Sequence, residues 1–362
     1  MLDEIGLMMI KGIGGITARS LISYFGSASE VFKAKKAQLQ KIAGIGSKTA
    51  DSILNKDTFN RAEQELKFIE KYKIEPLFYT SKKYPKRLLN CVDAPTLLYF
   101  KGKANLNQQK VVAVVGTRNA TNYGKAFCEQ LIEGLKNHGI LVVSGLAYGI
   151  DIAAHQAAIH HDLQTVGILG HGLDRIYPAL HRSFAEQMVK NGGLLTEFPS
   201  ETIPDRQNFP KRNRIIAGMA DAVIVVEATK TGGALITAEI ANSYNKDVFA
   251  VPGKVSDEFS DGCNFLIKTN RAHMLTRPED IEYIMGWFDK EPAKKSITPE
   301  LALNLNAEDQ KIVDLIKSKD GIAIDDLQNL LAMPQSKLTM ALLNLEMQSI
   351  IISLPGKVYR MN

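Results

Sequence analysis

Residues 111–118, Val-Val-Ala-Val-Val-Gly-Thr-Arg, decide the fold, because five apolar residues lead directly into a glycine turn. Similar short runs rich in valine, leucine and isoleucine recur at residues 140–143, 165–169, 194–196, 222–226 and 248–251. Most of these runs show no alternation of polar and apolar residues, which indicates strands buried on both faces. Helical patterns fill the intervals. Strands that alternate with helices predict a doubly wound α/β domain with a mostly parallel sheet.

Smaller segments flank this domain on both sides. Residues 1–75 read as short helices punctuated by two glycine hairpins, Gly12-Ile13-Gly14 and Gly44-Ile45-Gly46, which suggest an internal repeat. Residues 307–362 contain three helical patterns followed by a short hairpin. Three helices and a hairpin predict a winged helix, a variant of the helix-turn-helix.

Two connecting segments complete the organisation. Residues 76–109 contain the steps Tyr84-Pro85 and Ala94-Pro95 and read as an irregular connector. Residues 288–306 are rich in charged residues and proline and read as an exposed linker. The expected domains are therefore 1–75, 76–287 and 307–362, with 288–306 as the linker.

The composition is that of an ordinary globular protein. Over 362 residues it is 45% hydrophobic and 23% charged, a length that suits two or three domains. The net charge of +5 is small, so nucleic acid remains a candidate partner only if the basic residues cluster. Cys91, Cys128 and Cys263 are far apart, which excludes a disulfide scaffold and any CxxC motif. We find no signal peptide and no membrane-spanning run in the sequence, and we expect a cytoplasmic protein.

The second hairpin invites comparison with a nucleotide-binding loop. The stretch 44–49, Gly-Ile-Gly-Ser-Lys-Thr, departs from a Walker A motif because Ser47 separates Gly46 from Lys48 and no strand precedes it. A helix-hairpin-helix is the better interpretation, since its glycines let backbone N–H groups approach a DNA phosphate. The alternative, a hairpin kept for packing or protein contact, stays open.

Polar and glycine-rich loops follow the first two strands of the central domain. Gly116, Thr117 and Arg118 follow the first strand, and the lack of a GxGxxG spacing argues against a dinucleotide site. The guanidinium of Arg118 can pair with a phosphate, although it can also be a surface arginine on a structural loop. In the second loop, Ser144, Gly145 and Gly149 permit close backbone approach to a ligand and expose N–H donors.

Asp151 and His155 lie four residues apart on the helix that follows the second loop. This spacing would suit two metal ligands, but no third ligand is recognisable. We therefore interpret Asp151 as a helix cap and His155 as a hydrogen-bonded structural residue.

Residues 204–214 form a basic segment, with four cationic side chains against one acid, Asp205. The candidate ligand-binding residues within it are Arg206, Asn208, Phe209, Lys211, Arg212, Asn213 and Arg214. Cations for phosphates, an aromatic ring for stacking and amides for polar groups are what a single-stranded nucleic-acid groove needs. The alternative is a solvated charge run, which the phenylalanine and the prolines argue against.

A fourth loop, Thr231-Gly232-Gly233, precedes a helix and offers backbone N–H groups to an anion. Because parallel strands share their carboxyl edge, all four loops should meet there. The convergence predicts an anion or phosphodiester site. We recognise no Ser-His-Asp order, HExxH motif or paired carboxylates to which a catalytic role can be assigned.

Together these segments closely resemble the DprA (Smf) family of DNA-processing proteins. The resemblance is carried by segments 111–124, 142–155, 170–178, 208–218, 231–238 and 249–254. It implies an extended Rossmann-like domain between a helix-hairpin-helix or sterile-alpha-motif-like module and a winged helix. It also implies a non-enzymatic protein without cofactor or metal, which binds single-stranded DNA, helps to load a RecA-type recombinase in natural transformation, and forms a homodimer.

The resemblance also implies roles for individual residues. Arg118 and the group Arg212, Asn213 and Arg214 resemble phosphate contacts, and Phe209 resembles a base-stacking or pocket-forming residue. The backbone cradle of the family is matched by Ser144, Gly145, Ala147 and Gly149. The glycine-rich loops are similar to those of nucleotide phosphoribohydrolases too, but the fourth loop lacks the Pro-Gly-Gly-x-Gly-Thr pattern of those enzymes. In the tail from Ala307, six basic residues against seven acidic ones favour protein contact over strong duplex binding.

Overall fold

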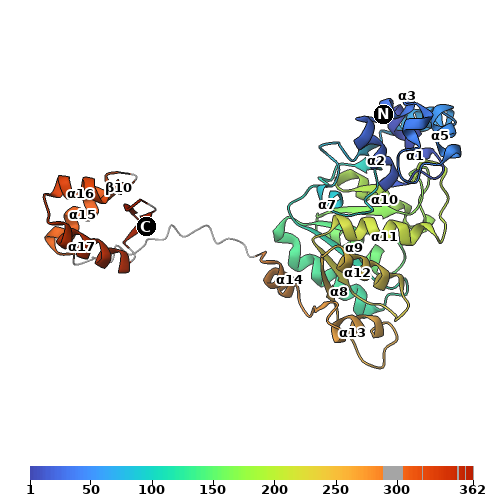
Figure 1. Cartoon of the computed structure of the whole chain (residues 1–362). Helices are drawn as coiled ribbons and strands as arrows, with labels where there is room; N and C mark the ends of the chain where they lie inside the picture. Colours follow the sequence, from blue (N-terminus) through green and yellow to red (C-terminus); the bar gives the residue numbers. More distant parts are fainter. Residues whose placement is uncertain (288–304, 320, 349, 355, 362) are drawn as a thin grey trace. The chain divides into compact units, whose positions relative to one another are not determined.

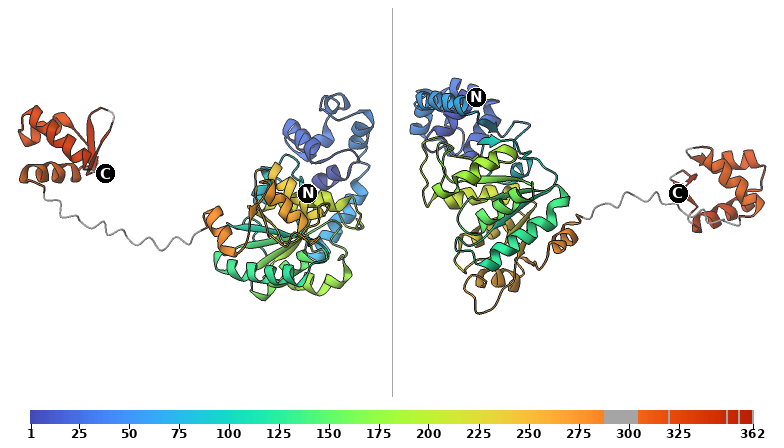
Figure 2. Two further views of the ribbon diagram at one scale, coloured as in Figure 1. Left: turned by 90° about the horizontal axis from the view of Figure 1, so that it is seen from below. Right: turned by 180° about the vertical axis from the view of Figure 1, so that it is seen from behind.

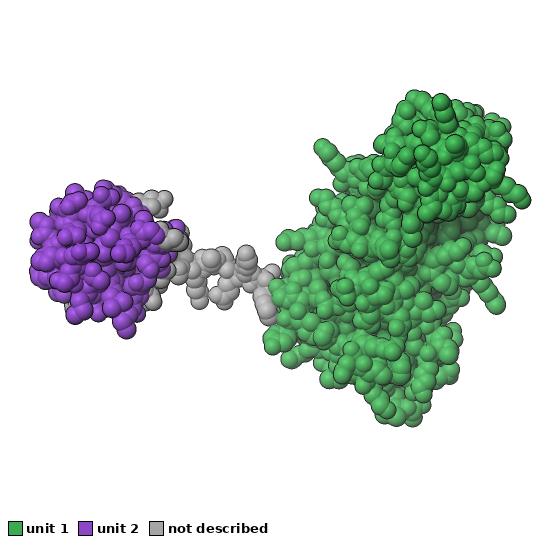
Figure 3. All heavy atoms as spheres, in the orientation of Figure 1, with its two compact units in different colours: residues 1–289 green, residues 290–362 purple. Residues whose placement is uncertain are grey.

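A computed structural model describes residues 1–287, 305–319, 321–348, 350–354 and 356–361 (Figure 1). The chain forms two compact units, Met1–Asp289 and Lys290–Asn362 (Figure 3). Residues 288–304 of the expected linker lie outside the described residues. No helix within the described ranges is long and apolar enough to cross a membrane.

The first unit begins with the helical module that the sequence predicts. Its two hairpins place Gly12 and Gly44 at φ of +91° and +85°, the left-handed region that favours glycine. Each hairpin leads into a helix, whose N-cap residue is Gly14 in one case and Gly46 in the other. The helices enclose an apolar core that includes Leu21. They are α1 (Leu2–Met9), α2 (Gly15–Phe25), α3 (Ala28–Lys33), α4 (Lys36–Leu39), α5 (Ser47–Leu54) and α6 (Phe59–Tyr72).

A buried carboxylate fixes this module to the α/β domain. Glu65 of α6 is 1% exposed and accepts hydrogen bonds from the backbone N–H of Ser200 at 3.0 and 3.1 Å. Arg61, one helical turn earlier, pairs with Glu65 at 3.0 Å and also donates to Ser200. A buried acid that is paired and hydrogen-bonded in this way avoids the cost of an isolated buried charge.

The α/β domain contains a nine-stranded sheet in the order β1-β2-β6-β5-β4-β3-β7-β8-β9. The pairs from β6 through β9 are all parallel, which confirms the prediction of a mostly parallel doubly wound sheet. The strands are β1 (Glu75–Phe78), β2 (Leu97–Gly102), β3 (Val111–Val115), β4 (Leu141–Ser144), β5 (Gln164–Leu169), β6 (Gly193–Thr196), β7 (Ala222–Val225), β8 (Asp247–Ala250) and β9 (His273–Met274).

The irregular connector expected over residues 76–109 is wrong, because this segment supplies most of β1 and all of β2. Both strands are antiparallel, and β2 pairs with β6 at one edge of the sheet. The apolar run Leu97–Phe100 is buried in the strand, whereas the prolines at 85 and 95 lie before it. The prolines therefore indicate the turns and the start of the short helix α7 (Lys86–Leu89), and they do not make the whole segment irregular.

Helices cover both faces of the sheet because the side chains of each strand alternate between them. Val112 and Val114 of β3 pack with α8, α9 and α14, while Val111, Ala113 and Val115 pack with α11, α12 and α13 on the opposite face. The helices lie on either side of the strands in the left view of Figure 2. Their bounds are α8 (Asn122–Leu135), α9 (Ile150–His160), α10 (Arg182–Asn191), α11 (Asn208–Met219), α12 (Gly233–Ser243), α13 (Asp261–Lys268) and α14 (Pro278–Met285).

The second unit has the predicted winged-helix arrangement. Its helices enclose a small core that includes Ile312, Leu327 and Leu342. A three-stranded sheet in the order β10-β12-β11 completes it, so the expected hairpin has one additional short strand beside it. The elements are α15 (Ala307–Lys317), β10 (Ile322–Ala323), α16 (Ile324–Leu331), α17 (Gln335–Met347), β11 (Ile351–Leu354) and β12 (Val358–Met361).

Candidate nucleic-acid interface

A pocket of about 500 Å³ lies at the carboxyl ends of the central strands. Residues from all four loops that the sequence singled out line it, as the shared edge of a parallel sheet requires. The predicted residues among its lining are Gly116, Thr117, Arg118, Ala147, Arg206, Phe209, Arg212, Asn213, Gly232 and Gly233. Two of the helices that contribute to it, α11 and α12, pack side by side (Figure 1).

Two glycines let the loop after β3 lie against the start of α9. A Cβ at Gly116 would overlap Ile150, and a Cβ at Gly149, where φ is +78°, would overlap the Thr117 carbonyl. Backbone hydrogen bonds fix this loop, from Thr117 N–H to the Glu227 carbonyl at 2.7 Å and from Ile150 N–H to the Thr117 carbonyl at 3.1 Å. The loop therefore presents the next residue, the exposed Arg118, from a rigid base.

Arg212 occupies the floor of the pocket. Its side chain is 4% exposed and lies over Gly145, where a Cβ would overlap both its guanidinium and the carboxylate of Asp151. The Nε and Nη1 atoms of Arg212 have no hydrogen-bond partner among the described residues. Burial lowers the pKa of Arg212 to about 10, against the opposing effect of Asp151, so the guanidinium stays protonated at neutral pH. The site thus holds a buried cation with unused donors.

Asp151 does not cap α9 as expected, because Gly149 takes the N-cap position. The Asp151 side chain instead accepts a hydrogen bond from the Ala147 N–H at 3.4 Å, and burial raises its pKa despite the neighbouring Arg212. The structural role expected of His155 is confirmed. Its Nδ1 lies 2.7 Å from the Thr165 hydroxyl, and burial lowers its pKa to about 3.

The aromatic ring of Phe209 lies between an arginine and a tyrosine. The guanidinium carbon of Arg118 is 5.3 Å from the ring centroid of Phe209. The ring centroids of Tyr177 and Phe209 are 6.2 Å apart, and the angle between the two ring planes is 31°. Arg206 lines the pocket near the start of α11, while Asn213, one turn after Phe209, donates to the Gly233 carbonyl at 3.4 Å. Cations, an aromatic face and an amide therefore share one cavity.

The start of α12 forms the remaining wall. Gly232 is the N-cap residue and its N–H donates to the Thr229 carbonyl at 3.1 Å. Gly233 begins the helix in the open, with no atom within 4 Å of the position of an added Cβ. Free N–H groups at a helix N-terminus favour an anion, because they lie at the positive end of the helix dipole.

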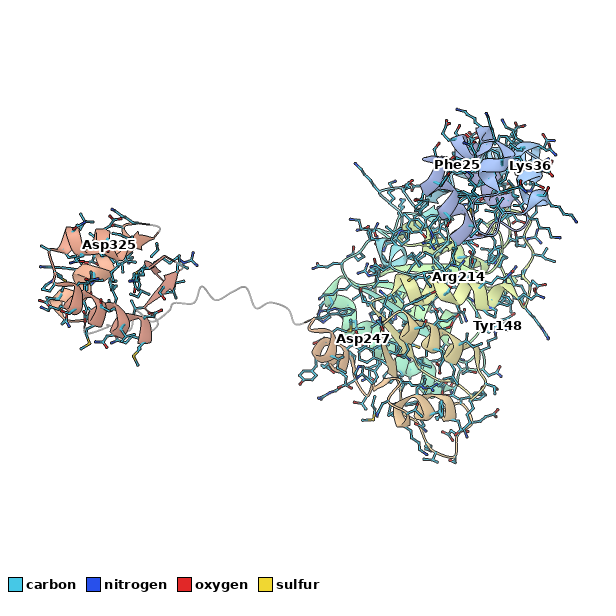
Figure 4. The ribbon with its side chains drawn as sticks, in the orientation of Figure 1. Phe25, Lys36, Tyr148, Arg214, Asp247 and Asp325 are labelled. Atoms are coloured by element: carbon cyan, nitrogen blue, oxygen red, sulfur yellow. The ribbon has the colours of Figure 1, made fainter. Side chains whose placement is uncertain are left out.

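Several predicted residues do not line the pocket, namely Ser144, Gly145, Gly149, Asn208, Lys211, Arg214 and Thr231. Ser144 is buried and donates to the Val114 carbonyl at 2.5 Å, so it supports the strand rather than facing a ligand. Arg214 pairs with Glu197 and donates to the Asp93 carbonyl at a separate cavity. Figure 4 labels Arg214, which lies within the body of the first unit on α11.

Sequence reasoning missed two exposed tyrosines beside the pocket. Tyr177 is 47% exposed next to Phe209, and Tyr148 is 43% exposed and stacks edge-on against His181 at 5.1 Å. Figure 4 shows Tyr148 at the periphery of the unit. Both occur in loops that follow strands, and an aromatic residue in such a loop is a signal that the sequence already contained.

The fold defines an α/β protein with a mostly parallel sheet, an N-terminal helix-hairpin-helix module and a C-terminal winged helix. The chain belongs to the DNA recombination-mediator protein A family, also called DprA or Smf, whose model matches residues 75–285. A SAM-like helix-hairpin-helix tandem matches residues 4–56, and the DprA winged helix domain matches residues 296–357.

Individual relatives agree with this assignment. Protein Smf of Synechocystis is 34% identical over 275 residues, which cover 74% of this chain and 68% of that protein. DNA processing protein DprA of Streptococcus pneumoniae is 41% identical over 198 residues, 55% of this chain and 70% of that protein. The crystal structure of the pneumococcal protein aligns with a TM-score of 0.70 at 32% identity, covering 78% of this chain and 97% of the other.

A second solved structure is that of DNA processing protein A from Helicobacter pylori, described for its single-stranded DNA binding mode. It aligns with a TM-score of 0.55 at 28% identity, covering 60% of this chain and 98% of the other.

Proposed function

We propose that this protein binds single-stranded DNA in the pocket at the carboxyl edge of its sheet. Arg118, Arg206 and Arg212 would contact phosphates, assisted by the backbone N–H group of Gly233 at the start of α12. Phe209 would stack against a base. The Helicobacter pylori relative, which is described as binding single-stranded DNA, supports the same ligand for this chain.

The observation that carries the proposal is the buried guanidinium of Arg212, a lining residue of the pocket whose Nε and Nη1 atoms have no hydrogen-bond partner among the described residues. A buried polar group without a partner is costly, so an anionic ligand that pairs with it gains a strong charge-assisted contact. The described residues that line the pocket include three arginines and one carboxylate, that of Asp151. The local charge therefore favours a phosphate.

The ring of Phe209 supports a single strand rather than a duplex. A base can stack on an aromatic face only when it is not enclosed in a helix, and such stacking tolerates any sequence. We expect binding that is largely independent of sequence and sensitive to salt, since each phosphate neutralised by a cation releases counterions.

Substitution of Arg118 tests this proposal without disturbing the core, because Arg118 is exposed whereas Arg212 is buried. We expect Arg118→Ala to weaken binding of a fluorescent oligothymidylate about tenfold and to reduce the slope of log affinity against log salt by about 0.7. Arg277→Ala is the matched control, since Arg277 is exposed and paired only with Asp280 at the start of α14. Equal affinity of Arg118→Ala and the wild-type protein would contradict the proposed groove.

We also propose, from membership of the family, that the protein is a non-enzymatic homodimer that helps to load a RecA-type recombinase on incoming DNA in the cytoplasm. Light scattering of the purified chain tests the dimer. Recombinase filament formation on oligonucleotides coated with single-strand-binding protein tests the loading. A monomer, or filament formation at the same rate with and without the protein, would contradict the respective part.

A phosphoribohydrolase activity in the same pocket is not favoured. The glutamate next to the fourth loop, Glu227, is buried and accepts hydrogen bonds from the N–H and hydroxyl of Thr121 at 2.9 and 2.5 Å. The Glu227 carboxylate therefore holds the start of α8 through these hydrogen bonds and is not available to a substrate. Appreciable release of free base from nucleoside monophosphates would revive the enzymatic alternative.

A further inference from the structure

Three side chains of the types that can bind transition metals come together between α8 and the end of α9. Nδ1 of His160 lies 2.6 Å from Oε1 of Glu129, and Nε2 of His161 lies 2.9 Å from the same oxygen. The three possible ligand atoms all lie within 4.8 Å of one another. Glu129 belongs to α8, whereas the histidines are the last residue and the C-cap of α9.

We propose that Glu129, His160 and His161 form a binding site for a divalent first-row transition metal, with zinc as the ion that best fits. Imidazole nitrogen and carboxylate oxygen are standard zinc ligands, and two histidines with one carboxylate leave a fourth position for water. This site is independent of the proposed DNA pocket and was not expected from the sequence.

An ion can enter if the side chains move by about 1.5 Å or less, because the two histidine nitrogens lie within 4.8 Å of each other and must reach about 3.3 Å. Zinc bonds of about 2.0–2.1 Å in a tetrahedral site place ligand atoms about 3.3 Å apart. The two nitrogen–oxygen separations of 2.6 and 2.9 Å must therefore open by less than about 1 Å. The His160 side chain is 73% exposed and that of Glu129 is 43% exposed, so both have room to rotate.

The position of the cluster gives the ion a structural role. Asp151, in the first turn of α9, lines the proposed DNA pocket, and α9 ends at His160, so the cluster lies at the other end of this helix. The negative end of the α9 dipole also favours a cation there. An ion held by both helices would tie α8 to α9 and stabilise the folded domain, since a ligand that binds only the native state shifts the unfolding equilibrium.

Titration of the untagged, metal-free full chain with zinc tests the proposal. We expect one saturable site per chain by calorimetry, a rise of a few degrees in Tm, and d–d absorption bands when cobalt(II) replaces zinc. Glu129→Gln and His160→Gln should each weaken binding by more than about tenfold, because even an outer-sphere partner of a metal ligand contributes about 10–100-fold. His273→Gln is the matched control, since His273 is exposed beside Asp247 at 3.8 Å but is not part of this cluster.

The outcomes separate clearly. Binding that is lost in both cluster variants and kept in the control supports the site. Absence of saturable zinc binding, or equal affinity in the cluster variants and the wild-type protein, overturns it. Circular dichroism and affinity for oligothymidylate, which the cluster variants should retain, show that they fold. Failure of the wild-type protein to bind DNA would contradict the proposed function and leave the metal titration intact as a test.

Discussion

Substitution of Gly233 by alanine should move stability and DNA affinity in opposite directions. Gly233 is the first residue of α12, its φ lies outside the left-handed region, and nothing lies within 4 Å of an added Cβ. The hydrogen bonds that its backbone carbonyl accepts from the side chains of Asn213 and Thr237 survive the change. Alanine reduces the freedom of the unfolded chain, so we expect the free energy of unfolding to rise by about 0.4–1 kcal/mol.

The same methyl group would project into the proposed DNA pocket, which Gly233 lines. If a phosphate approaches the N-terminus of α12 closely, the methyl group stands in its path. We expect affinity for oligothymidylate to fall about tenfold, equivalent to about 1.4 kcal/mol.

Fluorescence anisotropy measures the affinity, and urea denaturation followed by circular dichroism measures the stability. Gly46→Ala is a comparison for the added methyl group alone, because Gly46 also has open space at its Cβ but is the N-cap residue of α5 in the helical module. A variant at Gly233 that gains stability and binds DNA as well as the wild-type protein would refute the close approach. Loss of stability would instead refute the inference that the folded chain has room for the methyl group.

Three further predictions follow from the site and its support. Tyr177→Ala should weaken DNA binding severalfold while Tyr177→Phe retains it, as measured by anisotropy, because the proposed contact uses the ring beside Phe209; equal loss in both would exclude stacking. A chain that ends at Trp287 should keep its DNA affinity in the same assay, because the first unit contains the pocket; complete loss would assign binding to the tail. When the pH is lowered from 7 to 5, the contribution of His155 should reduce the free energy of unfolding, measured by urea denaturation, by about 2 kcal/mol. The unfolded state takes up a proton below pH 6.5 whereas buried His155 resists protonation down to about pH 3, so stability falls with pH across that window. The His155→Gln variant should lose this part of the pH dependence. An unchanged slope of the free energy of unfolding against pH in that variant would contradict the role assigned to His155.

Much of the fold could be predicted because its signals are local. The run 111–115 contains five apolar residues, and all are buried in a central strand. The shared edge of a parallel sheet then predicted that Arg118, Phe209 and Gly233 come together, although they are distant in sequence. The two antiparallel edge strands were missed because the nearby prolines were given more weight than the apolar run 97–100.

The roles within the basic segment could not be read from charge alone. Arg212 and Arg214 are both cations of one helix, yet only Arg212 lines the pocket. The period of the helix separates them: Phe209, Arg212 and Ile216 follow one another at three and four residues and share a face. Arg214 lies about 200° around the helix from Arg212 and meets Glu197 instead. Burial of Arg212 depends on contacts with Gly145 and Asp151, which no local pattern contains.

The distribution of the arginines argues for a polymer rather than a mononucleotide. A pocket of about 500 Å³ falls in the usual range for small ligands, so its size does not distinguish the two. Arg212 lies on the floor, however, whereas Arg118 and Arg206 are exposed. An isolated nucleotide has its phosphates at one end, so it would pair with Arg212 and leave the exposed arginines without a phosphate. A strand that places one phosphate on Arg212 continues past the rim, where its neighbouring phosphates meet the exposed arginines. The net charge of +5 is therefore less informative than this division between one buried cation and two exposed ones.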